Sequence, residues 1–256
     1  MLHPPSAEPA WSRESLAQNP HEVEDKPERV RRMFTAIARS YDLNNRLHSF
    51  GRDQAWRRAA VRMASVRPSD EVLDVACGTG DLTRAFANAG VRRATGLDFT
   101  PAMLEIARAK RPRSHFAHTP IEYIEGDAMA LPFDDRSFDV VSIAFGLRNV
   151  ADASGALHEF RRVLRPGGRV IVLEFSQPRH RVVRAVNGFY CNRIMPRTAT
   201  LISRDTSGAY KYLPRSIETF LSREAMIEAL VEAGFCRVRL RPMTLGVCVA
   251  CRGDMD

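Results

Sequence analysis

The chain has 256 residues, 45% of them hydrophobic, and a formal net charge of +8. This length and apolar content predict one folded domain with a sizeable core and exclude a mainly disordered chain. The longest apolar runs, such as residues 170–173, are far shorter than the roughly 20 residues of a membrane-spanning helix, so no spanning segment is predicted.

The positive charge is almost entirely arginine, with 35 Arg against 3 Lys. A basic surface of this kind fits two partners, nucleic acid or an anionic membrane face. The 5 cysteines are odd in number and scattered, which favours reduced thiols and a cytoplasmic location over a disulfide framework. No metal site is expected, because the pair Cys248 and Cys251 has no second Cys or His pair near it.

Residues 1–26 are predicted to be a disordered tail, because they carry prolines, serine and mixed charge without periodicity. Residues 27–256 are expected to form a single domain that begins with two capping helices at 27–66. The first helix starts near Pro27 and ends near residue 42, and the second covers Arg52 to Ala64.

A buried strand, a glycine loop and the start of a helix are predicted in turn at residues 71–81. The strand carries Asp74 near its end. Gly78 and Gly80 then remove the side chains that would keep a ligand away from the backbone. Asp98 follows about 20 residues later, where a nucleotide-binding βαβ unit places the acid that accepts ribose hydroxyls. The glycine pair taken alone could also be an ordinary tight turn.

Strands and helices continue to alternate after the loop, which predicts right-handed crossovers and a parallel sheet. Further strands are expected at residues 121–124, 138–145 and 169–174. The first of these leads to Asp127 and Ala128, where the carboxylate could accept an adenine amino group or could simply cap a turn.

The last part of the chain departs from this alternation. Residues 177–215 are expected to be an insertion between the fifth and sixth strands, and a helix follows at 223–233. The strands at 237–240 and 245–250 are too close for a helical crossover, so they must form a hairpin. The predicted fold is α/β, with a seven-stranded and mostly parallel sheet that has one antiparallel edge strand.

The glycine loop resembles motif I of the class I S-adenosylmethionine methyltransferases, in which an acid at a strand end precedes a Gly-x-Gly turn. Thr83 stands where a dinucleotide fingerprint has a third glycine, which disfavours pyrophosphate. The resemblance implies the class I methyltransferase fold and S-adenosylmethionine as the cofactor. By position it implies cofactor contacts from Asp74, Gly78, Thr79, Gly80, Asp98 on the ribose, and Asp127 and Ala128 near the adenine.

Several segments resemble the ubiquinone and menaquinone biosynthesis C-methyltransferases, the demethylmenaquinone and polyprenyl-methoxybenzoquinol methylases. They include Tyr-Asp-Leu-Asn-Asn at 41–45, Phe-Gly-Leu-Arg-Asn at 145–149, Arg-Val-Leu-Arg-Pro-Gly-Gly at 162–168 and Tyr-Lys-Tyr-Leu-Pro-Arg-Ser-Ile at 210–217. The resemblance runs from residue 30 to the C-terminus. Four positions depart from it in ways that bear on the substrate rather than the cofactor: Asn44 and His48 replace apolar residues, Asp53 replaces His, and Ala144 replaces Ser.

This resemblance implies transfer of a methyl group from S-adenosylmethionine to a ring carbon of a polyprenylated quinol, either a demethylmenaquinol or a methoxybenzoquinol. By position, Arg148 would stabilise the ring phenolate, Asn149 would orient the ring hydroxyl, and Tyr41 and Asn45 would cap the pocket. Arg148 could instead form a structural ion pair, and Tyr41 could simply pack. The proton acceptor stays open, because an arginine with a pKa above ~12 is not a resting base.

Residues 179–204 contain six arginines and no acid, interleaved with apolar residues at helical spacing. Such a segment is predicted to bind an anionic membrane at its inner face, and the alternative is a lid helix with its arginines in water. A nucleic-acid partner is not expected, because the Pro-Pro motif of amino-methylating enzymes does not follow the fourth strand. The remaining alternative functions are methylation of another small molecule or of RNA, and a non-catalytic scaffold. Assembly as a homodimer is left open.

Overall fold

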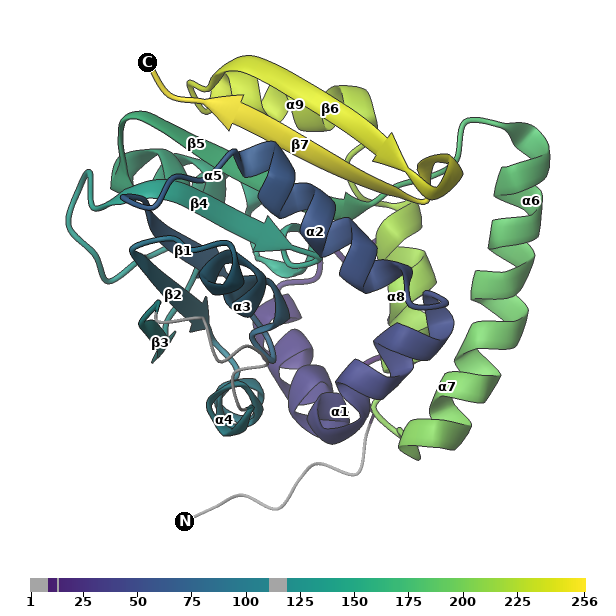
Figure 1. Cartoon of the computed structure of the whole chain (residues 1–256). Coiled ribbons are helices and arrows are strands. Elements are labelled where there is room, and N and C mark those ends of the chain that lie inside the picture. The colour runs from purple at the N-terminus through teal and green to yellow at the C-terminus, as the bar shows by residue number, and fades with distance from the viewer. Residues whose placement is uncertain (1–8, 13, 111–118) are drawn as a thin grey trace.

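The computed structural model describes residues 9–12, 14–110 and 119–256, and its centre is a seven-stranded sheet (Figure 1). Across the sheet the strands follow the order β3-β2-β1-β4-β5-β7-β6. They are β1 (Glu71–Val75), β2 (Arg93–Asp98), β3 (Ile121–Glu125), β4 (Phe138–Ala144), β5 (Leu164–Phe175), β6 (Cys236–Met243) and β7 (Cys248–Asp254). The strand order reverses between β1 and β4, which is the switch point at which open α/β sheets bind ligands.

Neighbouring strands from β3 to β5 are parallel, and β7 is antiparallel to both of its neighbours, β5 and β6. In this register Leu73 lies beside Thr95 on one side and Val141 on the other. The predicted fold class and the C-terminal hairpin are confirmed. The antiparallel strand itself is β7, which lies one place inside the edge, since β6 forms the edge.

Helices cover both faces of the sheet, and an apolar cluster lies between the sheet and the helices on each face. On one face, α2 (Arg52–Ala64) and α3 (Asp81–Asn88) bury Trp56 and Phe86. On the other face, α5 (Ala153–Val163) and α9 (Arg223–Glu232) bury Phe160 and Leu230. Because both faces are covered, the central strands are continuous apolar runs rather than alternating ones.

Helix α1 (Lys26–His48) runs past its predicted end near residue 42. The apolar pattern is lost there because Leu43 and Leu47 face solvent, with 54% and 50% of their surface exposed. The chain turns at Gly51, whose φ of 72° favours glycine, and α2 then has the predicted bounds. Figure 1 shows α1 between α4 (Pro101–Ala109) and α7, at the end of the sheet rather than on a face.

The described part of the N-terminal segment packs on the domain, so the prediction of a disordered tail is wrong for it. Trp11 is 1% exposed and stacks on Tyr212, with 4.5 Å between the ring centroids. The backbone N–H of Trp11 donates to the Ser207 carbonyl, and Val30 and Met33 of α1 complete the apolar cluster around the indole. One buried indole can hold such a segment, because it removes roughly 150–250 Å² from water. Residues 1–8 and 13 lie outside the described residues.

The insertion after β5 consists of helices, and the sequence predicted helical spacing only within residues 179–204 of it. They are α6 (Arg181–Phe189), the π-helical turn η2 (Tyr190–Ile194), α7 (Met195–Ser203) and α8 (Ala209–Glu218). Figure 1 shows α6 and α7 as one continuous helix along the outside of the molecule. Among the residues that the structure describes, no helix is both long and apolar enough to cross a membrane.

Candidate active site

The glycine loop lies at the carboxyl end of β1, where the chain enters α3. Gly78 and Gly80 have φ values of 55° and 78°, which L side chains rarely adopt. A Cβ atom on Gly80 would lie 2.3 Å from the Tyr123 hydroxyl, so Gly80 shapes the turn and leaves no room for a side chain. The Gly78 N–H donates to Oδ2 of Asp98 at 2.7 Å, which links the loop to the end of β2.

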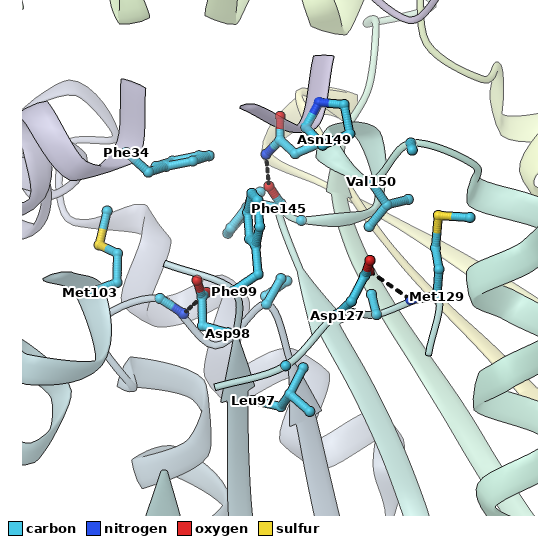
Figure 2. Close-up of a pocket in the computed structure, with 18 of the residues that line it drawn as sticks. Phe34, Leu97, Asp98, Phe99, Met103, Asp127, Met129, Phe145, Asn149 and Val150 are labelled. Atoms are coloured by element: carbon cyan, nitrogen blue, oxygen red, sulfur yellow. Dashed lines mark hydrogen bonds between the residues drawn. The ribbon is translucent and has the colours of Figure 1, made fainter. Parts of the chain in front are cut away.

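A cavity of about 760 Å³, its mouth included, lies at these strand ends and is called the strand-end cavity below (Figure 2). Gly78 and Asp98 line it from the first two strand ends, Asp127 and Ala128 line it from the loop after β3, and Phe34 of α1 covers it. A concave, mainly apolar site with a few carboxylates is typical of small-molecule sites. The structure therefore brings together four of the residues predicted to bind a cofactor.

Asp98 is 6% exposed, and two backbone groups hold its carboxylate. Oδ2 accepts from Gly78, and Oδ1 accepts from the Thr100 N–H at 2.9 Å. Burial raises the pKa of this carboxyl, and these hydrogen bonds oppose the rise. Each carboxylate oxygen can accept a further hydrogen bond, so Asp98 can still receive hydroxyl groups from the cavity.

Asp127 caps a turn, which is one of the two alternatives that its sequence left open, and it also lies at the cavity. Its Oδ1 accepts the Met129 N–H at 2.9 Å, which caps the turn, and the residue also lines the strand-end cavity (Figure 2). The turn therefore fixes the carboxylate and leaves Oδ2 available for an amino group. Ala128 beside it is 7% exposed and contributes an apolar wall.

A second cavity of about 1150 Å³, its mouth included, lies among α1, α2, α8 and the α6–α7 helix, and is called the helical cavity below. Tyr41, Asn45 and Arg148 line it. Most of its remaining wall is apolar or aromatic, including Trp56, Phe175, Tyr190, Tyr210 and Tyr212. Phe34, Tyr41 and Phe145 line both cavities, so the two cavities meet at these side chains.

Arg148 is buried in the wall of the helical cavity as half of an ion pair. Its Nη1 donates to Oε1 of Glu174 and to the Phe145 carbonyl, both at 2.7 Å. The guanidinium lies 5.3 Å from the centre of the Phe175 ring. Within the described residues Nη2 makes no hydrogen bond. The structural ion pair considered from the sequence is therefore present, and the same guanidinium also lines the cavity.

Asn149 is fixed from both ends of its amide. Its Nδ2 donates to the Phe145 carbonyl at 3.1 Å, and its Oδ1 accepts from the Tyr212 hydroxyl at 2.9 Å. Figure 2 shows Asn149 and Phe145 together at the strand-end cavity. Asn149 is 8% exposed, so it is a rigid polar group in the wall of the strand-end cavity, and it does not line the helical cavity.

Residues 22–254 match the ubiE/COQ5 methyltransferase family. The chain belongs to this family. A Ubiquinone/menaquinone biosynthesis C-methyltransferase UbiE from Shewanella frigidimarina is 39% identical over 234 residues, which cover 91% of this chain and 92% of that protein. The protein of the same name from Shewanella baltica is 38% identical over the same shares. This member of the ubiE/COQ5 family is therefore a methyltransferase.

Solved structures with the same fold are more distant in sequence. An S-adenosylmethionine-dependent methyltransferase from Thermotoga maritima, a possible histamine N-methyltransferase, has a TM-score of 0.62 and 19% identity, covering 89% of this chain and all of that one. A putative methyltransferase from Haloferax volcanii, solved with the activator Trm112, has a TM-score of 0.61 and 21% identity, covering 86% and 96%. Identities this low support the class I methyltransferase fold alone.

Three residues predicted to contact the cofactor, Asp74, Thr79 and Gly80, line neither cavity in this ubiE/COQ5 family member. Asp74 is 1% exposed and accepts hydrogen bonds from the Thr83 and Ser142 hydroxyls, and burial raises its pKa to about 6. The Thr79 hydroxyl donates to Asp42 of α1 at 2.6 Å. The side chains of Asp74 and Thr79 therefore bind residues that support the loop, rather than facing the space that a cofactor would occupy.

Other residues of the site were not predicted. Phe34 and Phe145 form the wall that the cavities share, Glu174 pairs with Arg148, and Tyr212 holds Asn149. The last two contacts span 26 and 63 residues of sequence, so no local pattern indicates them. The signal that was available is the family resemblance of the segments at 145–149 and 210–217.

Proposed function

We propose that the strand-end cavity binds S-adenosylmethionine, which would supply an electrophilic methyl group. The donor and acceptor groups of the cavity support this. Among the described residues, Asp98 keeps lone pairs that can accept ribose hydroxyls, and Oδ2 of Asp127 accepts no hydrogen bond and can receive an adenine amino group. Gly78 has no Cβ atom to keep a ligand away. None of these groups is placed to neutralise a phosphate, which agrees with a cofactor that has none.

We further propose that the substrate is a polyprenylated quinol, a demethylmenaquinol or a methoxybenzoquinol, and that a ring carbon accepts the methyl group. One observation supports this most strongly. A large apolar cavity with a buried arginine meets the strand-end cavity at Tyr41 and Phe145, so an aromatic ring held in one would face a cofactor held in the other. The relatives that are 38% and 39% identical are named as C-methyltransferases of ubiquinone and menaquinone biosynthesis.

The chemistry that this proposal requires begins with the ring hydroxyl, because a ring carbon becomes nucleophilic when a neighbouring hydroxyl loses its proton. With a phenol pKa near ~10, ionisation costs about 4 kcal/mol at pH 7. A donor aimed at that charge in a water-poor site contributes ~3 to 4 kcal/mol. Arg148 is the proposed donor, held in place by Glu174, and Asn149 orients the hydroxyl.

Binding and turnover together test the proposed function. Calorimetry on the purified protein should detect S-adenosylmethionine binding, and a short-chain quinol should be methylated in the same preparation. Unmodified tRNA serves as the alternative acceptor, because the net charge of +8 would also suit nucleic acid. Methyl transfer to tRNA with none to the quinol would contradict the proposal, and so would a failure to bind the cofactor.

We also propose that the enzyme is cytoplasmic and binds reversibly to the anionic inner face of the membrane, where a polyprenyl quinol is dissolved. The described cysteines are all free thiols. Val182, Val186 and Phe189 of α6 are 64%, 65% and 63% exposed and follow helical spacing. Exposed arginines accompany this stripe at Arg181, Arg184, Arg193, Arg197 and Arg204. Each basic side chain near an anionic leaflet contributes ~1 kcal/mol.

Vesicle sedimentation tests this surface. The wild type should bind anionic vesicles more tightly than neutral ones, and salt should weaken the binding. The double variant Arg181→Glu, Arg193→Glu should lose most of that preference while it still methylates a water-soluble quinol. The matched control is Arg58→Glu, Arg62→Glu, which makes the same charge change on exposed positions of α2. Equal binding of the wild type to neutral and anionic vesicles would refute the proposal.

A further inference from the structure

His48 lies in the last turn of α1, in the wall of the helical cavity. Tyr41 and Asn45 line the same cavity from the preceding turns, because positions 41, 45 and 48 share one face of a helix. A titratable imidazole in the proposed substrate cavity has no function in the chemistry described so far.

The hydrogen bonds of His48 determine which ring nitrogen can accept a proton. The Tyr190 hydroxyl lies 3.1 Å from Nδ1 and donates its proton to the His48 backbone carbonyl at 3.3 Å. With the Tyr190 proton on that carbonyl, the Tyr190 oxygen accepts from Nδ1, and this is the tautomer that the inference below requires. Nε2 then carries the lone pair. This atom is buried and has no hydrogen-bond partner in the described chain.

Burial also lowers the pKa of His48 below its ordinary value, so the ring is neutral near pH 7. A neutral imidazole with a buried, unpartnered lone pair is ready to accept a proton. It is also a costly arrangement unless a ligand satisfies it, because a buried polar atom without a partner has lost its hydrogen bonds to water. His48 lines the helical cavity, so the partner that this reasoning requires is a hydroxyl group of a ligand bound there.

The other ionisable groups that line the helical cavity are not suited to take this proton. They are Tyr41, Asp53, Arg57, Arg148, Tyr190, Cys191, Tyr210 and Tyr212. Burial raises the pKa of the four tyrosines and of Cys191, so they stay protonated. Arginine does not act as a resting base. Asp53 is occupied by Arg57, Arg46 and the Ser49 hydroxyl.

We infer that His48 is the proton acceptor of the methylation, with Nε2 taking the proton of a quinol hydroxyl. This inference rests on the proposed function. The O–H bond breaks with its electron pair left on oxygen, and the charge spreads to a ring carbon. That carbon would form the new C–C bond as the methyl–sulfur bond of the sulfonium breaks, and the sulfur would keep that electron pair and leave as a neutral thioether. The ring carbon then loses its own hydrogen as a proton and the oxygen regains one, so that the ring is again a quinol. One proton is therefore released per turnover, and it leaves from His48 to solvent.

Two variants test this assignment. His48→Gln keeps a polar side chain of similar length but removes the base, and we expect kcat to fall by about a hundredfold or more. The wild type should lose activity on the acid side of its pH profile, as the pH falls through the lowered pKa of His48 and the ring takes up a proton. That limb should be absent from His48→Gln. In His48→Ala, added imidazole should restore part of the lost rate, in proportion to the concentration of unprotonated imidazole.

The controls separate a catalytic effect from a structural one. Both variants should keep the wild-type affinity for S-adenosylmethionine, because His48 does not line the strand-end cavity. His158→Gln removes an exposed histidine of α5 and should keep full activity. Burial raises the pKa of Asp74 to about 6, so Asp74 can add an acid limb of its own to both profiles. The decisive quantity is therefore the difference between the wild-type and His48→Gln profiles.

The outcomes distinguish this inference from the proposed function on which it rests. An active wild type together with a His48→Gln variant of equal kcat, or one that retains the acid limb, overturns the assignment of His48 alone. A wild type that binds S-adenosylmethionine but never methylates a quinol overturns the proposed function, and the inference with it. A slow variant without the acid limb, rescued by imidazole in His48→Ala, confirms His48 as the base.

Discussion

Removing one partner of the buried Arg148–Glu174 pair should destabilise the fold more than removing both. The two residues are 5% and 1% exposed, and Nη1 lies 2.7 Å from Oε1. The change Arg148→Met leaves the Glu174 carboxylate buried without its cation, and breaking a buried pair costs ~3 to 5 kcal/mol. We expect the lower end, about 3 kcal/mol, because the Phe175 N–H still donates to Glu174 at 2.8 Å.

The double variant Arg148→Met, Glu174→Gln removes the uncompensated charge and should recover at least half of that loss. Urea unfolding of the wild type, both single variants and the double variant at pH 7 gives the coupling energy. A loss below about 1 kcal/mol in Arg148→Met, or strictly additive losses, would refute the reasoning. The double variant should still turn over about a hundredfold more slowly than the wild type, because the proposed donor to the phenolate is gone.

Three further changes test the other parts of the site. Asp98→Asn should weaken S-adenosylmethionine binding by ~1 to 3 kcal/mol, because charge-assisted hydrogen bonds to the ribose are lost; unchanged affinity in calorimetry would contradict that assignment. Asp74 has its pKa raised from 3.8 to about 6, so its stabilising contribution is complete below pH 3.8 and is lost as the pH rises through 6. Between pH 4 and pH 7 the wild type should therefore lose about 2 kcal/mol of unfolding free energy relative to Asp74→Asn, and an equal pH dependence of the two proteins would refute it. Trp11→Ala should lower the free energy of unfolding by ~3 to 5 kcal/mol. No loss of stability in urea unfolding would instead support the original prediction that the N-terminal segment is disordered.

The sequence was a good guide where structure depends on local chemistry. The bounds of α2, the Gly-x-Gly turn at the end of β1 and the carboxylate of Asp98 at the end of β2 all follow from patterns within a few residues. The hairpin of β6 and β7 follows from the short connection between them. These features are set by backbone conformation and chain length, which a sequence expresses directly.

Contacts between distant segments could not be predicted in this way. Trp11 lies in a segment without periodicity, and its burial depends on Tyr212, which the fold brings beside it. In the same way, the side chain of Thr79 turns to Asp42 of α1 rather than to the cavity. A motif places such residues near a site, but only the packing of other elements decides which way each side chain faces.

The position of the transferred methyl group is the most direct test of the account. The enzyme would be incubated with S-adenosylmethionine carrying a ¹³C-labelled methyl group and a short-chain quinol that has one open ring position, and the product analysed by carbon NMR. We predict a single new methyl signal in the aryl-methyl region, because the roles proposed for Arg148, Asn149 and His48 activate a ring carbon where the two cavities meet. A signal in the methoxy region, or label found on no part of the quinol, would contradict the account.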